Sequence, residues 1–217
     1  MVSTAIPISL SNGIGSAGQG RIFELVGGHP LLDLVNTLDW RFREEGSEEF
    51  LETYKDLLDF AEQSQLIAPR QTRRMLRAVN ESAAHRVLAS VKELREGAAN
   101  VFYSLLDGAA PAAATIKTLE KYFRSARDHQ RLTWSDGRLV WDWTEADPSP
   151  ELVLWLPSLS AAHLMTSEDM QRVRACGNAE CRWLFLDTSK NHTRRWCDMR
   201  ICGNRMKARR FKAQRRG

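Results

Sequence analysis

Hydrophobic residues recur at helical spacing along most of this chain. Leu31, Leu34, Val35 and Leu38 follow Pro30, a residue favoured at the first position of a helix, and they predict a short helix with one buried face. A later helix is predicted over residues 71–79, with Pro69 at its start. Further helices are predicted over 83–106, 112–127, 151–165 and 167–174. The chain is therefore expected to be mainly helical.

Another helix is expected after Ser47. This residue is followed by Glu48 and Glu49, and a serine before two acids is typical of an N-cap and a favourable first turn. The apolar residues behind it form one stripe, which consists of Phe50, Leu51, Tyr54, Leu57, Leu58 and Ala61.

Two regions have the character of strands. Residues 22–26 (Ile-Phe-Glu-Leu-Val) predict a short strand that ends at Gly27-Gly28. Residues 132–134 and 139–143 flank Asp136-Gly137, a strong signal for a β-hairpin. The predicted fold class is α+β and mainly helical, with a hairpin whose Trp134, Trp141 and Trp143 cover the helices or, alternatively, form a dimer contact.

The first twenty residues carry no Lys or Arg and are rich in Ser and Gly, which favours a flexible tail over a signal peptide. No apolar run reaches the roughly 20 residues needed to cross a bilayer, because the best one, 151–165, contains Pro157. We therefore expect a cytoplasmic protein without a membrane partner, in which cysteines stay reduced.

Charge is distributed unevenly. Residues 172–217 hold 14 Lys and Arg against 3 Asp and Glu, a balance of +11, whereas the other 171 residues hold 17 against 24, a balance of −7. A basic end on an acidic body is typical of a polyanion-binding module, although a solvated basic tail is the simpler alternative. The pattern predicts a tail over 1–20, a body over 21–170 and a module over 171–217.

All four cysteines lie in this basic end, as Cys176-x4-Cys181 and Cys197-x4-Cys202. Two short-spaced pairs separated by a loop suit one tetrahedral zinc ion, and four thiolates leave no open coordination position for catalysis. The spacing therefore predicts one structural Zn²⁺. Redox chemistry is the rival interpretation, but no Cys-x-x-Cys is present.

A four-residue gap does not align two sulfurs on a regular helix, so each pair needs a turn. Gly177-Asn178 supplies turn formers in the first pair. In the second pair, Cys197 is expected at a strand end and Cys202 in the first turn of a helix, with residues 187–193 as a hairpin loop. Such a module is treble-clef-like, with three aromatic side chains packed on the ligands: Trp183, Phe185 and Trp196.

The residues after Cys202 favour a helix with cations on much of its circumference, suited to a DNA groove or backbone. The candidate nucleic-acid contacts are Arg194, Arg195, Arg205, Lys207, Arg209, Arg210, Lys212, Arg215 and Arg216.

These motifs resemble a known family pair. Residues 181–189 and 194–199, followed by Cys202-Gly203-Asn204-Arg205, closely resemble the CGNR zinc finger. Residues 27–37 (Gly-Gly-His-Pro-x-Leu-Asp-Leu-Val-Asn-Thr) resemble its usual partner, the ABATE domain. The resemblance covers nearly the whole chain after residue 20, and it implies a bacterial stress-induced transcription regulator with a treble-clef zinc finger for DNA.

Polar residues also gather around the first predicted helix: His29, Asp33, Asn36, Thr37 and Arg41. One hypothesis is a small-molecule effector site that changes the disposition of the zinc module. The simpler interpretation is a set of buried polar groups that satisfy backbone at loops and helix ends.

The expected function is a DNA-binding transcription regulator that responds to stress or to a ligand. No Gly-rich phosphate loop or nucleophile elbow is present, and nothing in the sequence argues for an enzyme. The alternatives are an RNA- or protein-interaction module without sequence-specific DNA binding, and an enzyme acting on a small ligand near Asp33 and Asn36. A homodimer would suit palindromic DNA, but no long apolar seam specifies one.

Overall fold

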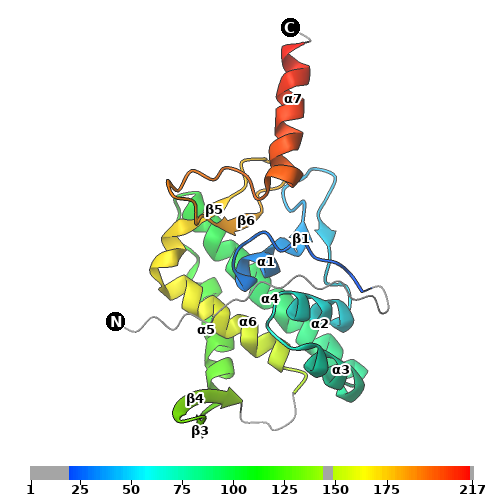
Figure 1. Cartoon of the computed structure of the whole chain (residues 1–217), viewed down its shortest axis with the longest axis vertical. Helices are drawn as coiled ribbons and strands as arrows, with labels where there is room; N and C mark the ends of the chain where they lie inside the picture. The colour runs from blue at the N-terminus through cyan, green and yellow to red at the C-terminus, as the bar shows by residue number, and fades with distance from the viewer. Residues whose placement is uncertain (1–19, 144–148, 216–217) are drawn as a thin grey trace.

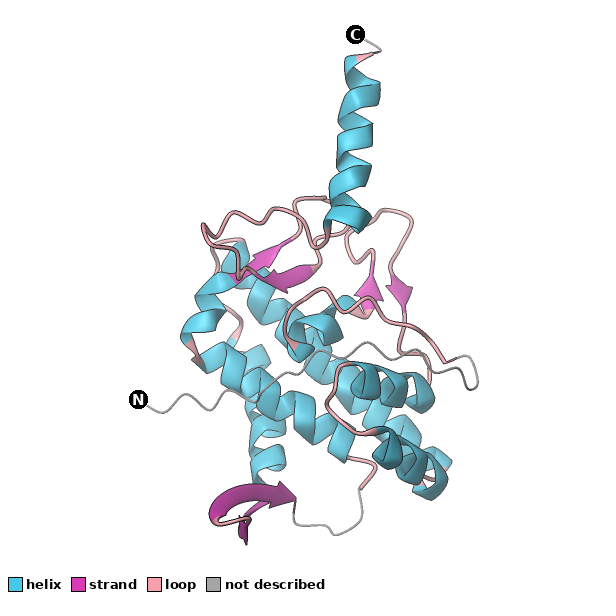
Figure 2. Cartoon of the chain, viewed as in Figure 1, coloured by secondary structure: helices cyan, strands magenta, loops and turns pink. Residues whose placement is uncertain are grey.

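The computed structural model describes residues 20–143 and 149–215, so residues 1–19 of the predicted tail over 1–20 lie outside the described part of the chain. The elements in order are α1 (Pro30–Asn36), β1 (Leu38–Asp39), β2 (Glu48–Glu49), α2 (Tyr54–Gln63), α3 (Pro69–Ala78), α4 (Glu81–Leu106), α5 (Ala113–Asp128), β3 (Gln130–Ser135), β4 (Arg138–Trp143), α6 (Leu152–Thr166), the 3₁₀ turn η1 (Glu168–Arg172), β5 (Val173–Ala175), β6 (Leu184–Leu186), the π-helical turn η2 (Met199–Gly203) and α7 (Asn204–Gln214). Helices dominate, and the strands form three small antiparallel pairs (Figures 1 and 2). The α+β, mainly helical fold class is confirmed.

The body is built around α4, which packs against α1, α2, α5 and α6 (Figure 1). Leu94, Ala98 and Phe102 on its inner face are buried. Gly97 lets α5 approach closely, since a Cβ at this position would lie 3.0 Å from Leu119 Cδ2. Within the described residues, no helix is long and apolar enough to cross a membrane.

The helix predicted after Ser47 begins later than expected. Glu48 and Glu49 form β2, which pairs with β1, and the N-cap of α2 is Thr53. The hydroxyl of Thr53 accepts from the backbone N of Asp56, whose carboxylate accepts from the backbone N of Thr53 in return. This capping box starts the helix there, so the Ser47 cap prediction is wrong, whereas the predicted stripe from Leu51 to Ala61 is buried as expected.

The predicted strand at residues 22–26 is also wrong. The segment has no regular secondary structure, and α2 satisfies its backbone through a side chain rather than through a strand. Phe23 N donates to Gln63 Oε1 at 3.0 Å, and Gln63 Nε2 donates to the carbonyl of Arg21 at 2.8 Å. Phe23 is buried edge-to-face against Phe60, with ring centroids 5.5 Å apart.

The β3–β4 hairpin is confirmed, with Asp136 and Gly137 both at positive φ, 50° and 77°, as a tight primed turn requires. Trp143 at its base stacks on Trp155 of α6. The hairpin does not cover the helices beyond that point, because Trp134 and Trp141 are 72% and 67% exposed.

The first strands of the cysteine-rich end, β5 and β6, pack into the same hydrophobic core as the helices. The predicted helix at 167–174 shortens to η1, and Val173 begins β5, which pairs with β6 in the register Val173↔Leu186 and Ala175↔Leu184. Val173, Leu184 and Leu186 belong to the same buried cluster as the helices. The hairpin β5–β6 is therefore packed onto the helical body rather than hung from it.

Candidate zinc centre and basic helix

Four cysteine sulfurs converge beside β5, β6 and the start of α7. These three elements lie in the upper part of Figure 1. The Sγ atoms of Cys176, Cys181, Cys197 and Cys202 all lie within 4.8 Å of one another, and all four residues are buried. The Cys181 and Cys197 sulfurs are 3.9 Å apart. This is the separation expected for tetrahedral thiolates about 2.3 Å from one zinc, and it is nearly twice the length of a disulfide bond.

The first pair sits on the loop that joins β5 to β6. Cys176 N donates to Trp183 O at 2.8 Å and extends the ladder by one bond, while Gly177 N donates to Arg195 O at 2.9 Å. The carbonyl of Asn178 accepts from the backbone N of Cys181, and its side-chain amide donates to the sulfur of Cys202 at 3.7 Å. An N–H directed at a thiolate stabilises its negative charge, so Asn178 supports the centre from outside the ligand set.

In the second pair, Cys202 lies in the π-helical turn η2 and Cys197 lies just before this turn. The carboxylate of Asp198 caps it by accepting from the backbone N of Arg200 and Ile201, and its carbonyl accepts from the backbone N of Cys202 at 3.0 Å. Cys202 thus precedes α7 directly, close to the expected first helical turn. Cys197 lies in irregular backbone, so the strand expected there is wrong.

The hairpin that carries the first pair also differs from the expectation. Its arms are β5 and β6 and not the two sides of the 187–193 loop. Asp187, fully buried, organises that loop by accepting from the backbone N of Ser189 at 2.9 Å and of Arg194 at 3.0 Å. The hydrogen bonds of this carboxylate, rather than pairing between strands, hold the loop in the conformation that brings the chain back to the zinc ligands.

The residues fit a structural zinc. Four thiolates complete a tetrahedron, so the ion they hold has no free position for a substrate, and its role is to fix the fold. Trp183 and Phe185 are buried against the cysteines and Trp196 is partly buried there, as the sequence predicted. The module is a treble-clef-like zinc finger with one structural zinc ion.

The polar residues around α1 hold the outer edge of β6. The Asn36 side chain makes two bonds to one residue: Nδ2 donates to Leu184 O at 2.9 Å, and Oδ1 accepts from Leu184 N at 2.8 Å. Leu186 N donates to Gly27 O at 2.7 Å. Backbone groups of β6 that face away from β5 are therefore satisfied by α1 and by the segment preceding it.

His29 and Asp33 organise the start of α1. His29 is the N-cap, and its Nδ1 accepts from Leu31 N at 3.2 Å, which requires a neutral ring; burial lowers the pKa of His29 to about 4. Asp33 Oδ1 accepts from Gly27 N at 2.7 Å. Burial raises the pKa of the Asp33 carboxyl to about 7, although that bond and Arg194 oppose the shift.

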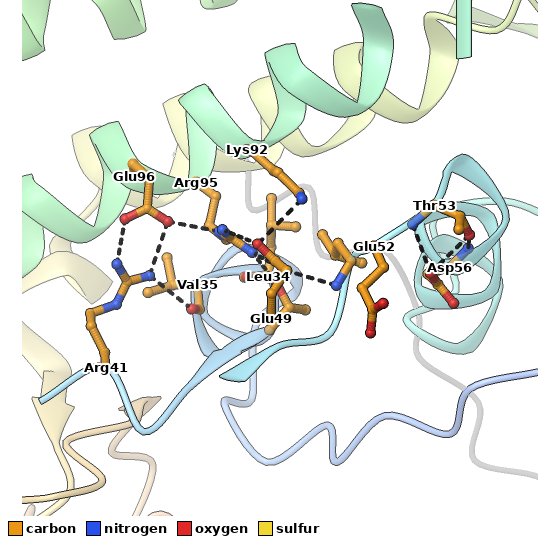
Figure 3. Close-up of polar contacts among 12 residues, drawn as sticks. Leu34, Val35, Arg41, Glu49, Glu52, Thr53, Asp56, Lys92, Arg95 and Glu96 are labelled. Atoms are coloured by element: carbon orange, nitrogen blue, oxygen red, sulfur yellow. Dashed lines mark hydrogen bonds and ion pairs between the residues drawn. The ribbon is translucent and has the colours of Figure 1, made fainter. Parts of the chain in front are cut away.

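Thr37 and Arg41 join an ionic network with Glu49 of β2 and with Arg95 and Glu96 of α4. Figure 3 shows the side chains of Arg41, Glu49, Arg95 and Glu96 in this network. The buried Arg95 guanidinium of α4 donates to Thr37 Oγ1 at 3.1 Å and to both carboxylate oxygens of Glu49 at 2.7 and 2.8 Å. Arg41 pairs with Glu96, which also accepts from Arg95. The five residues predicted as a small-molecule site thus each have a protein partner, and ligand binding there stays a prediction.

The basic helix α7 projects from the zinc centre away from the body (Figure 1). Of the candidate nucleic-acid contacts, six are exposed: Arg195, Arg205, Lys207, Arg209, Lys212 and Arg215. The side chain of Arg210 and the residue Arg216 lie outside what the structure describes.

Several of these candidates have partners within the protein. Arg195 lies 5.0 Å over the Trp196 ring, and Arg215 lies 4.7 Å over the Phe211 ring. Arg194 lies over the Phe185 ring at 4.2 Å and donates to the carbonyls of Val26 and Trp196 at 3.0 Å each. The guanidinium therefore links the zinc module to the N-terminal segment. A guanidinium that already donates to protein carbonyls is less suited to a DNA contact. Arg205 lies 5.0 Å over the Trp40 ring, and Arg209 pairs with Glu180 at 3.1 Å.

Family models match this architecture in two consecutive segments. The ABATE model, described as "Putative stress-induced transcription regulator", matches residues 28–168, and the CGNR zinc finger matches residues 172–215. The chain belongs to the ABATE family. Among curated proteins, none is significantly similar to it.

Within this ABATE protein, each position of the Cys-Gly-Asn-Arg motif has a local role. Cys202 supplies a sulfur, and a Cβ at Gly203 would lie 2.6 Å from Met199 Sδ and 3.3 Å from Trp196 Cδ1, so a larger residue there would require the Met199 side chain to move. Asn204 begins α7, and Arg205 returns toward the body. The motif therefore sets the direction of the helix that leaves the zinc.

Sequence reasoning missed several residues that join the two segments. The Arg182 guanidinium lies 4.6 Å over Phe42 and 5.2 Å over Tyr103, and it donates to Asp107 at 2.7 Å. Together with Trp40, these residues connect the finger to β1 and α4. An arginine beside a zinc ligand was a signal for an interaction, but its partner lies 75 residues away in sequence.

Proposed function

We propose that this ABATE protein is a DNA-binding transcription regulator in which the zinc centre orients α7 toward DNA. The body over residues 21–170 would sense a stress signal or ligand, and the module over 171–217 would contact DNA. The description of the ABATE family as a transcription regulator supports this proposal, and so does the zinc finger. Both families are of regulator or zinc-finger type, which favours a protein that is not an enzyme.

The observation that carries the proposal is the position of α7. It begins next to a zinc ligand, it projects from the body, and its Lys207, Lys212 and Arg215 side chains are exposed (Figure 1). A rigidly anchored cationic helix is suited to a DNA groove, where lysine and arginine neutralise phosphates and displace counterions. A flexible tail could carry the same positive charge, but it would not hold the lysine and arginine side chains in a fixed direction relative to the body.

The contacts between finger and body give a route for regulation. Asn36 and the Gly27 carbonyl hold β6, while Trp40 holds Arg205 at the base of α7. A ligand at the predicted site (His29, Asp33, Asn36, Thr37 and Arg41) would have to replace some of these bonds. It would thereby alter the hold on β6 and with it the direction of α7.

DNA binding is tested by fluorescence anisotropy with zinc-loaded protein over a series of salt concentrations. If four cations contact phosphate, the affinity should fall roughly 4,000-fold for a tenfold increase in salt. A triple variant, Lys207→Ala/Lys212→Ala/Arg215→Ala, should reduce the slope of log affinity against log salt by about 3.

The matched control removes the same charge from an exposed face of α3, as Arg70→Ala/Arg73→Ala/Arg77→Ala. Its salt slope should equal that of the wild type. An equal loss in both triple variants would show attraction by net charge alone. Equal affinity for RNA with no preferred DNA sequence would favour the RNA-interaction alternative, and turnover of a small molecule lost in Asp33→Ala would favour an enzyme.

A further inference from the structure

The hairpin β3–β4 has one polar and one apolar face. Its register pairs Leu132 with Trp141 and Trp134 with Leu139, so these four side chains project from the same face. The opposite face carries Thr133, Val140 and four polar or charged residues: Arg131, Ser135, Arg138 and Asp142. A strand pair with this alternation is expected to pack its apolar face on another layer.

The body supplies that layer only at the base of the hairpin. Trp143, on the apolar face, stacks on Trp155, which also stacks on His129. Farther out, Leu132, Trp134, Leu139 and Trp141 are 52%, 72%, 59% and 67% exposed. Among the described residues, none covers these four side chains, although a two-stranded hairpin on its own is at best marginally stable in water.

The uncovered area is large enough for a specific interface. At these exposed fractions the two tryptophans and two leucines present roughly 500 Å² of apolar surface per chain. A contiguous patch of this size differs from the single exposed hydrophobic residues that are common on monomers. Packing of two such faces would remove roughly 1,000 Å² from water, which is the lower limit for a biological interface.

We propose that this face is a homodimer interface in which two copies of the hairpin pack face to face about a two-fold axis. The patch is self-complementary, because each cross-strand layer holds one tryptophan and one leucine. In an antiparallel arrangement, the Trp134–Leu139 layer of one copy meets the Leu132–Trp141 layer of its partner, and the reverse contact follows by symmetry.

Charge and position favour a second copy over a lipid surface. The patch itself contains no charged side chain, and residues 1–171 have a balance of −7, which opposes binding to anionic membranes. The hairpin and α7 lie at opposite ends of the molecule (Figure 1), so pairing through the hairpin leaves the basic helix free. The inference stands independently of DNA binding.

Sedimentation equilibrium of the zinc-loaded full chain, without nucleic acid and at high salt, tests the proposal. The wild type should show a reversible monomer–dimer equilibrium. Trp134→Asp should raise the dimer dissociation constant on the order of 1,000-fold, because a two-fold interface loses the same anchor twice. Ser135→Asp introduces the same charge one residue along, on the polar face, and should leave the equilibrium unchanged.

Two further readouts separate loss of contact from loss of fold. Zinc content and thermal midpoint of Trp134→Asp should match those of Ser135→Asp, and wild-type tryptophan emission should shift to shorter wavelength as concentration rises through the dimer transition. A wild type that stays monomeric, or a dimer that Trp134→Asp leaves intact, would overturn the proposal. So would a monomer that binds phosphatidylcholine vesicles and loses that binding in Trp134→Asp.

Discussion

Asn36 is the most direct link between α1 and the zinc-bearing hairpin. Its amide satisfies both backbone groups of Leu184, over distances of 2.9 and 2.8 Å, and both residues are buried, with exposed fractions of 4% and 0%. Asn36→Ala removes both bonds and leaves an N–H and a C=O without partners in a site that water does not reach.

The magnitude follows from those two groups. Each buried backbone group left unsatisfied costs about 1–3 kcal/mol, so the loss of two partners in Asn36→Ala should lower the free energy of unfolding by about 2–6 kcal/mol. For a chain of this size, 1 kcal/mol shifts the melting temperature by about 2–4 °C, which gives a fall on the order of 10 °C. Asn36→Asp should be at least as harmful, because it keeps the acceptor but sets a carboxylate against the carbonyl of Leu184.

The assay is urea unfolding followed by circular dichroism, with zinc held at saturation in every sample. Asn100→Ala on α4 is the control, because Asn100 is exposed and bonds only to Thr115 in the described structure; its unfolding free energy should change by less than about 0.5 kcal/mol. If Asn36→Ala unfolds within that same margin of the wild type, the amide does not hold β6 and the proposed connection between body and finger fails.

Three further perturbations give separate tests. Cys202→Ser should release zinc, measured by metal analysis, and unfold the residues after about 170, because the metal contributes about 10 kcal/mol or more to the folding of such modules; stoichiometric, tightly held zinc in this variant would contradict the four-thiolate centre. Asp33→Asn should gain stability relative to the wild type as pH rises. The folded pKa of Asp33, about 7, exceeds its unfolded value near 3.8, so the stability that the protonated carboxyl contributes below pH 3.8 is lost as pH rises through 7. Between about pH 5.5 and 7 the difference in unfolding free energy should grow by about 2 kcal/mol, and a flat difference in urea titrations would exclude a buried neutral carboxyl. Arg95→Met should cost about 3 kcal/mol in the same titrations, since it strips Glu49 of its bidentate partner and leaves Lys92 at 3.5 Å as its remaining cation; addition of Glu49→Gln should restore part of the loss.

Local chemistry explains what the sequence could predict. Asn80 before Ala83 marks the N-cap of α4, and Asp136-Gly137 determines the turn of β3–β4, because each signal acts within a few residues. The four cysteines were recognisable for a similar reason, since two short-spaced pairs of thiolates leave few alternatives to zinc.

Predictions failed where a distant residue decides the structure. Glu49 resembles a first-turn helix residue in sequence, but Arg95, 46 residues away, holds it in a strand. Thr53 and Asp56 carried a capping-box signal that competes with Ser47, and the structure follows the capping box. Asn36 acts on a strand 148 residues later, a contact that no periodicity encodes.

Selection from random DNA tests whether zinc orients α7 for sequence-specific DNA binding. Zinc-loaded wild-type protein and Cys202→Ser, which keeps every cation of α7, would be carried through the same rounds and sequenced. We expect an enriched motif with the wild type and none with Cys202→Ser. Recovery of no motif by the wild type, or of the same motif by both proteins, would show that zinc does not orient α7 for sequence-specific binding.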